Sequence, residues 1–83
     1  MNETVYLVMA CDFEYTDPHC FFDDEAEAEE YAQRANTIYL QTYAEIAGDK
    51  YWRQILPDEL KKQGLDPYAK EYRVVPVPRG KLK

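Results

Sequence analysis

One apolar stripe, running from Asp24 to Ala47, limits the possible folds of this chain more than any other feature. Small and apolar side chains recur in it at three- and four-residue spacing: Ala28, Tyr31, Ala32, Ala35, Ile38, Tyr39, Thr42 and Ile46. This pattern predicts one long helix with a single buried face. Such a helix measures ~36 Å, but a globular chain of 83 residues is only about 24 Å across. We therefore expect the helix to bend near Asn36-Thr37 or to overhang the rest of the fold.

The ends of this helix carry their own signals. Asp24 is a good N-cap residue, and Glu27 follows it three positions later, as in a capping box. The neighbouring Asp23 and Glu25 suit the positive end of the helix dipole. Gly48 is expected to end the helix.

The segment 49–70 is predicted to form two short helices that cover the overhang. Asp49 would cap the first, which reaches Ile55, and Pro57 would open the second, which Gly64 closes. Their apolar side chains would pack against the distal turns of the long helix: Trp52, Leu56, Leu60 and Leu65.

Two segments near the N-terminus predict a β-hairpin. Residues Thr4 to Phe13 are apolar on both parities, which is typical of a central strand with one face on a helix and the other at least partly covered. His19 to Phe22 would be its partner, after a turn at Glu14 to Pro18. A turn centred between residues 15 and 16 sets Cys11 opposite Cys20 and Met9 opposite Phe22.

The last predicted strand, Glu71 to Val77, belongs at an edge of the sheet. Pro76 and Pro78 share a parity, so both missing N–H groups point the same way, which only an outer edge accepts. The expected fold is α+β: a small antiparallel sheet of order 2-1-3 with the long helix across one face. Residues 1–83 would form a single ββαβ-type domain, with a loose basic tail at 79–83.

Charge is distributed very unevenly along the chain. Residues 1–33 hold ten acidic residues and no Lys or Arg, while residues 34–83 hold six acids and ten bases, and the sum is a net charge of −6. An acidic surface steers cationic partners and repels nucleic acid. Duplex DNA is therefore not an expected ligand, although Lys50-Tyr51-Trp52-Arg53 has the basic and aromatic character of a nucleic-acid surface.

Several kinds of chemistry lack the residues they need. The chain has no Ser and one His, His19, so a Ser-His-Asp triad cannot form. Cys20 adjoins His19 and would point to the opposite face of a strand, and one His with two Cys falls short of four zinc ligands. A disulfide between Cys11 and Cys20 is conceivable, but free thiols are expected in a reducing compartment. We expect no catalytic residues, no metal and no cofactor.

The hairpin VYLVMACDFEYTDPHCFF, the helix start FDDEAEAEEYAQRAN and the strand EYRVVPVP resemble a class of small phage and mobile-element proteins of strand, strand, helix, strand design. The class includes inhibitors of host defence such as anti-CRISPR proteins. The likeness covers residues 4–36 and 71–78, and segment 48–70 is an insertion to this pattern. It implies a protein that acts by binding in the cytoplasm of a bacterial host, in keeping with the absence of a predicted membrane span or secretory signal.

Two functions follow from these patterns. The first is a non-enzymatic inhibitor that occupies a basic surface of a host protein through a set of acidic residues: Asp12, Glu14, Asp17, Asp23, Asp24, Glu27 and Glu30. The same acids are also explained as helix capping and solvated surface. The second is a homo-oligomerising structural or accessory module with an aromatic interface formed by Tyr39, Tyr43, Tyr51 and Trp52.

Overall fold

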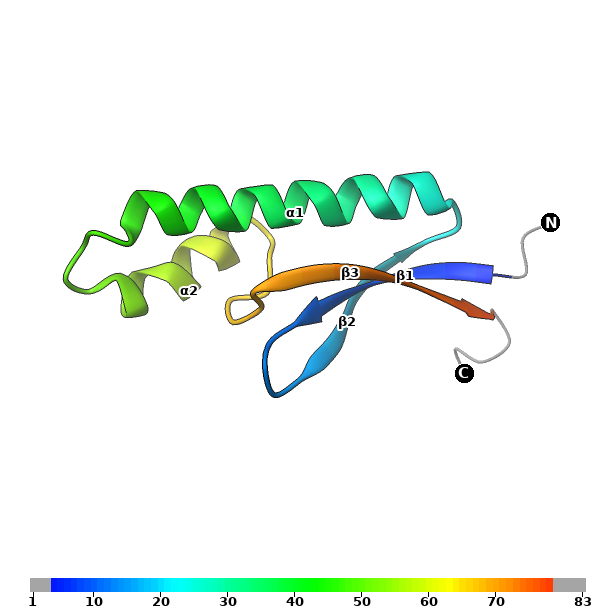
Figure 1. The fold of residues 1–83 in the computed structure, drawn as a ribbon, viewed down its shortest axis with the longest axis horizontal. Coiled ribbons are helices and arrows are strands. Elements are labelled where there is room, and N and C mark those ends of the chain that lie inside the picture. Colours follow the sequence, from blue (N-terminus) through cyan, green and yellow to red (C-terminus); the bar gives the residue numbers. More distant parts are fainter. Residues whose placement is uncertain (1–3, 79–83) are drawn as a thin grey trace.

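The computed structural model of the chain describes residues 4–78 and has the predicted α+β fold. Three strands form an antiparallel sheet in the order β2-β1-β3: β1 (Thr4–Cys11), β2 (Thr16–Phe22) and β3 (Glu71–Pro78). Two helices, α1 (Glu25–Ile46) and α2 (Trp52–Lys62), lie between β2 and β3 in the sequence and on one side of the molecule (Figure 1). The expected tail at 79–83 lies outside the described residues.

Helix α1 overhangs the sheet and does not bend. Asp24 is its N-cap, and its side chain accepts a hydrogen bond from the N–H of Ala26 at 3.0 Å. The C-terminal half of the helix runs past the strands, and α2 lies beneath it (Figure 1). The molecule is accordingly elongated, with extents of 50 × 23 × 19 Å.

The prediction of two short helices in segment 49–70 was wrong, because α2 continues through Pro57. Proline removes one backbone hydrogen bond, here the one to the carbonyl of Arg53, and Arg53 is exposed to water. Leu56 and Leu60, on either side of Pro57, are both buried and hold the helix on the core. Asp49 is not the N-cap that was expected: Tyr51 holds that position and forms no side-chain cap hydrogen bond, although the Asp49 carboxylate accepts from the N–H of Tyr51 at 2.7 Å.

The end of α2 follows the sequence prediction closely. Gly64 takes a left-handed conformation with φ +79°. The N–H of Leu65 donates to the carbonyl of Leu60 at 3.0 Å, and the N–H of Gly64 donates to the carbonyl of Lys61 at 3.1 Å. These two bonds, with Leu60 and Leu65 both buried, make a Schellman motif.

The predicted hairpin register was also wrong. Cys11 pairs with Thr16, and Cys20 pairs with Val8. Phe22 lies opposite Tyr6, so it does not face Met9. The chain reverses earlier than expected, through Phe13 and Glu14, and the N–H of Asp12 donates to the carbonyl of Tyr15 at 2.9 Å.

Pro18 explains the error, because it belongs to β2 and not to the turn. It tolerates that position because β2 is an edge strand, where a missing N–H costs no ladder bond. A register shift between Val8 and Met9 leaves His19 as an extra residue in β2, which is a β-bulge.

Strand β3 is an edge strand, as its prolines predict. The side-chain amide of Asn36 on α1 binds both backbone groups of Tyr72: its Nδ2 donates to the carbonyl at 3.1 Å, and its Oδ1 accepts from the N–H at 2.7 Å. Tyr72 therefore presents its backbone to the outer edge. Pro76 and Pro78 share its parity, so their missing N–H groups lie on the same edge.

The core lies between the helices and one face of the sheet. Val8 and Ala10 of β1 pack there against three alanines of α1, Ala28, Ala32 and Ala35, and against Leu56, Leu60, Leu65, Ala69 and Tyr72. Small residues on α1 let the helix approach the sheet closely. No described helix covers the other face, which was expected to be at least partly covered (Figure 1).

Candidate interaction surfaces

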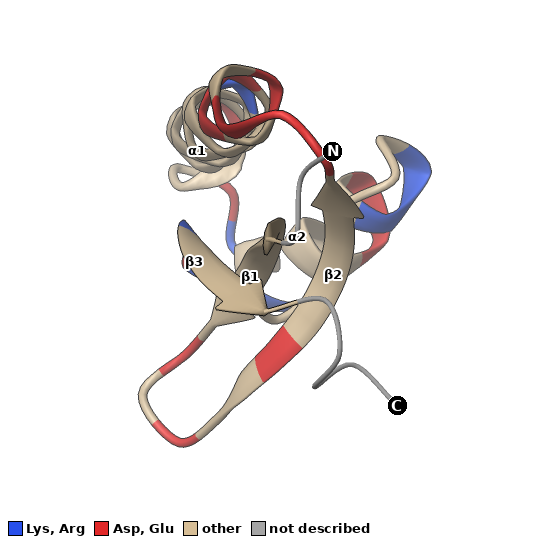
Figure 2. Ribbon diagram, turned by 90° about the vertical axis from the view of Figure 1, so that its right-hand side faces the viewer, with Lys and Arg blue, Asp and Glu red and all other residues tan. Residues whose placement is uncertain are grey.

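The acidic residues singled out in the sequence fall into two separate groups. A hairpin group, Asp12, Glu14 and Asp17, lies around the β1–β2 turn, and a helix-start group, Asp23, Asp24, Glu27 and Glu30, lies where β2 gives way to α1. Strand β2 separates them, and its 7 residues span about 23 Å at ~3.3 Å per residue. Figure 2 shows acidic segments at the hairpin and, apart from them, on α1. The acidic residues therefore form two patches and not one continuous surface.

The hairpin group is partly engaged within the molecule. The carboxylate of Asp12 accepts from the N–H of Phe13 at 2.7 Å and lies 3.9 Å from the ammonium of Lys70. Asp12 and Asp17 also lie near the hydroxyl of Tyr15. Tyr15 donates to Asp66 at 3.1 Å, and desolvation followed by this hydrogen bond raises the pKa of Tyr15 to about 12.

The helix-start group is exposed and retains most of its negative charge. Asp23, Asp24, Glu27 and Glu30 are all exposed, as are the intervening Glu25 and Glu29. Glu30 forms an ion pair with Arg34 at 3.0 Å. That pair is on the surface, so it contributes little to stability and leaves the region strongly anionic.

The aromatic set is mainly internal packing. The rings of Tyr39 and Tyr43 stack at 6.3 Å, and Tyr43 meets Trp52 edge-on at 5.4 Å. Arg53 covers the Trp52 ring at 5.4 Å. Burial raises the pKa of Tyr39 above its ordinary value. These contacts join α1 to α2 under the overhang, and Tyr51, which is 56% exposed, stands outside them.

His19 and Cys20 share the helix side of the sheet, contrary to prediction, because the bulge re-aims one of them. Nε2 of His19 lies 2.9 Å from the hydroxyl of Tyr31, and its ring meets Tyr72 edge-on at 5.3 Å. Desolvation raises the pKa of the Cys20 thiol. A raised pKa keeps the sulfur protonated, which disfavours a nucleophilic role.

The two cysteines cannot form a bond within one chain. Cys11 has the parity of Leu7 and Met9, on the face of the sheet away from the helices, whereas Cys20 pairs with Val8 on the helix face. They are also about three residues out of register, or ~10 Å along the strands, beyond the reach of a disulfide. Both are free thiols. Among residues 4–78, no group of three or more His, Cys, Asp or Glu side chains is placed to hold a metal ion.

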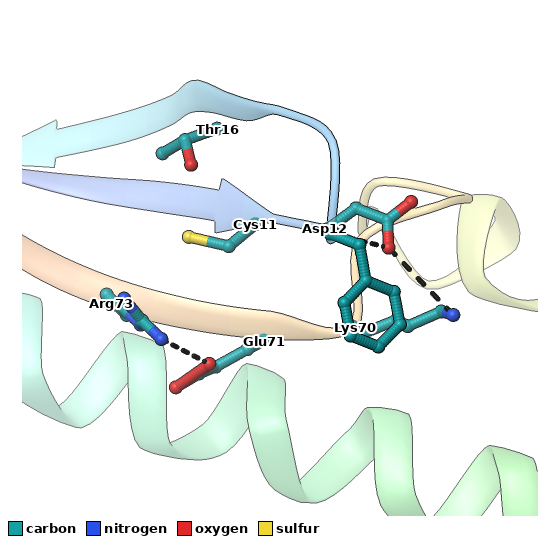
Figure 3. Close-up of a pocket in the computed structure, with 7 residues that line it drawn as sticks. Cys11, Asp12, Thr16, Lys70, Glu71 and Arg73 are labelled. Carbon is teal, nitrogen blue, oxygen red and sulfur yellow. Dashed lines mark hydrogen bonds and ion pairs between the residues drawn. The ribbon is translucent and has the colours of Figure 1, made fainter.

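A pocket that the sequence did not indicate lies beside the hairpin turn (Figure 3). Its volume is about 320 Å³, and it is lined by Cys11, Asp12, Phe13, Thr16, Lys70, Glu71 and Arg73. Its charged groups are paired: Lys70 with Asp12, and Arg73 with Glu71 at 3.0 Å. Arg73 holds the pKa of the Glu71 carboxyl below its ordinary value. Phe13 closes one side, with the Lys70 ammonium 4.7 Å from its ring, and it is 91% exposed.

The pocket continues into an apolar area on the same face of the sheet. Phe21 and Val75 flank Leu7 across the three strands, since Leu7 pairs with both. Phe21 is 59% exposed and Val75 is 41% exposed. We call this surface the open face and define it by Leu7, Met9, Pro18, Phe21, Val75 and Val77. This surface can be found only from the pairing register of the three strands, because the sequence alone does not show which face of an apolar strand a helix covers.

Comparison of the chain with protein-family models, curated proteins and solved structures found no match. Neither α1 nor α2 is long and apolar enough to cross a membrane, and this holds for the described part of the chain. The assignment of function therefore depends on the surfaces described above.

Proposed function

We propose that this protein is a non-enzymatic acidic binding protein that inhibits a host defence or nucleic-acid-handling protein by occupying its basic surface. The proposal depends chiefly on the helix-start group, where six exposed acidic residues between Asp23 and Glu30 face water. Glu30 also forms a surface ion pair with Arg34 at 3.0 Å. The resemblance to phage and mobile-element proteins supports this class of function and a location in a bacterial cytoplasm.

The geometry changes which acids we assign to the interface. Asp12 is already paired with Lys70, and the hairpin group lies a strand length from α1. The helix-start group is therefore the proposed contact, and the hairpin group is at most a second one. The acidic residues are too few to imitate DNA fully. Duplex DNA carries about 20 charges per ~34 Å turn, whereas residues 1–33 hold ten acidic residues.

A non-enzymatic role agrees with the chemistry of the described side chains. The thiol of Cys20 is held in its protonated form, and His19 is occupied by Tyr31. The second candidate, an oligomerising module built on Tyr39, Tyr43, Tyr51 and Trp52, has less support. Three of its four rings already contact one another within the chain.

Affinity capture from lysate of the native host tests the proposal. Immobilised protein is expected to retain one host protein at low salt and to lose it at about 0.5 M salt. At that concentration the Debye length is only ~4 Å, so salt screens the attraction between the two surfaces. The variant Glu27→Lys/Glu30→Lys should retain much less of that protein. The matched control, Glu14→Lys/Asp17→Lys, changes the net charge equally at the hairpin group and should retain most of it. Equal loss with both variants would show that net charge, and not this surface, determines binding, and the proposal would fail.

A further inference from the structure

The open face is an apolar area of the described surface that neither α1 nor α2 covers (Figure 1). Its central row, Phe21-Leu7-Val75, lies across all three strands, and Met9 and Val77 extend it along the strands. Exposed apolar patches of this kind mark interaction sites more often than single exposed residues do. The helices occupy the opposite face and cannot cover it (Figure 1).

Both edges of the sheet are closed to a partner that would add a strand. On β3 the backbone of Tyr72 is bound by Asn36, and Pro76 and Pro78 offer no N–H. On β2 the edge is interrupted by Pro18 and by the bulge at His19. These are devices by which proteins prevent edge-to-edge pairing. A partner must therefore bind the open face itself.

The charge on this side of the molecule argues against a strongly charged partner. Among residues 4–78, two ion pairs border the open face, Lys70 with Asp12 and Arg73 with Glu71, and neither adds net charge. The chain as a whole carries −6. A strongly charged partner gains no electrostatic attraction from a neutral face. A second copy of the chain presents the same neutral apolar surface, and its helix-start acids lie in its helix layer, on the side of the sheet away from the contact.

We propose that the open face binds a second copy of this chain, with the two sheets packed face to face about a two-fold axis parallel to the strands. Under this symmetry β2 of one copy lies over β3 of the other. Phe21, the large residue at one edge, then lies over Val75, the smaller residue at the other edge, and the reverse contact forms as well. Leu7 meets its own symmetry mate at the centre.

The size of the face sets the expected strength. Three strands at ~4.8 Å and 8 residues at ~3.3 Å give a footprint of about 14 × 26 Å. This is about 360 Å² per copy, less than half of the ~800 Å² per partner of a standard specific interface, so the dimer should be weak and reversible. The dimer does not depend on the proposed function, because the helix-start group lies on the other layer.

Sedimentation of the purified protein between about 10 µM and 1 mM, the range expected for a weak interface, tests the proposal. The apparent mass should rise from 9.8 kDa to about twice that value. Phe21→Lys and Val75→Glu should each remain monomeric at 1 mM. Both side chains are 41% exposed or more, so the fold should persist, which far-UV circular dichroism checks. Leu40→Lys is the matched control, since Leu40 is 65% exposed on α1, and it should dimerise like the unchanged protein.

Mixing Phe21→Lys with Val75→Glu tests the symmetry. The lysine of one copy would face the glutamate of the other, so the mixture should regain dimer that neither variant forms alone. A monomeric mixture would overturn the two-fold arrangement. Monomeric behaviour of the unchanged protein up to 1 mM, or loss of the dimer in Leu40→Lys, would overturn the use of the open face. None of these results depends on whether the affinity capture succeeds.

Discussion

At the scale of single residues, Asp66 fixes the position of the loop between α2 and β3. Its carboxylate accepts hydrogen bonds from the hydroxyl of Tyr15 and from the N–H groups of Tyr68 and Ala69, at 3.1, 2.8 and 3.0 Å. Its own N–H donates to the hydroxyl of Tyr72 at 2.9 Å. Asp66 thus joins the hairpin, the loop and β3. In this network the Tyr15 hydroxyl donates a hydrogen bond and the Tyr72 hydroxyl accepts one.

This network predicts loss of stability at alkaline pH. Burial is the main cause that raises the pKa of Tyr15 and Tyr72 from 10 to about 12. A raised phenol pKa means that the folded state favours the neutral phenol. The resulting contribution to the free energy of unfolding is complete below pH 10 and is lost between pH 10 and 12. The free energy of unfolding in urea should therefore fall steeply above pH 10.

Tyr15→Phe isolates one part of this effect. It should lower stability at pH 8, because a hydrogen bond to Asp66 is lost, and it should flatten the decline at high pH. Tyr68→Phe is the control, since that ring is 65% exposed. An unchanged slope in Tyr15→Phe would mean that this phenol does not link stability to pH.

At the scale of elements, two glycines in similar positions should behave in opposite ways. Gly64 closes α2 with φ +79°, a conformation that costs a side chain strain, so Gly64→Ala should destabilise the protein by about 1 kcal/mol. Gly48 follows α1, has no positive φ and has open space around it. Gly48→Ala should therefore be neutral or stabilise by up to ~1 kcal/mol. Urea unfolding of both variants measures the difference, and equal losses would contradict the assignment of the Schellman motif.

The elements also show where prediction from sequence succeeds. The periodicity of α1, the cap at Asp24 and the paired prolines of β3 are local patterns with one physical meaning each, and all three were confirmed. The arithmetic on helix length predicted a bend or an overhang, and the structure shows the overhang (Figure 1). The predictions at Pro18 and Pro57 were wrong, because proline marks turns and helix starts by default. Pro18 is tolerated on the outer edge of β2, whereas Pro57 loses one helix hydrogen bond while the buried Leu56 and Leu60 hold α2 on the core.

Other features could not be predicted, because they depend on contacts between distant residues. The Asn36 amide on the backbone of Tyr72 joins positions 36 residues apart. The bulge at His19 changed which side chains share a face, and the pocket beside Cys11 needed the true register. Of the predicted acidic site, the helix-start acids lie at the start of α1 as expected, but Asp17, expected in the turn, lies in β2. The separation into two groups already follows from hairpin geometry, because the turn and the exit of the second strand lie at opposite ends.

At the scale of the whole molecule, the core joins the sheet to the overhang and predicts a single folding unit. Val8 and Ala10 of β1 belong to the same cluster as Leu56 and Leu60 of α2. The long α1 packs on both, so neither half retains its buried face without the other. The two ends of this elongated molecule should therefore unfold together.

Leu60→Ala tests this cooperativity. Leu60 is 1% exposed, and its truncation should cost about 2–5 kcal/mol through lost burial and a cavity. Trp52 fluorescence reports on the overhang, and far-UV circular dichroism reports on all elements. In the unchanged protein and in Leu60→Ala, the fluorescence and the circular dichroism should each change at the same urea concentration, and that concentration should be lower for Leu60→Ala. Trp52 lies against Tyr43 at the end remote from the helix start, so an earlier fluorescence transition would show that the α1–α2 end unfolds alone and that the chain contains two units.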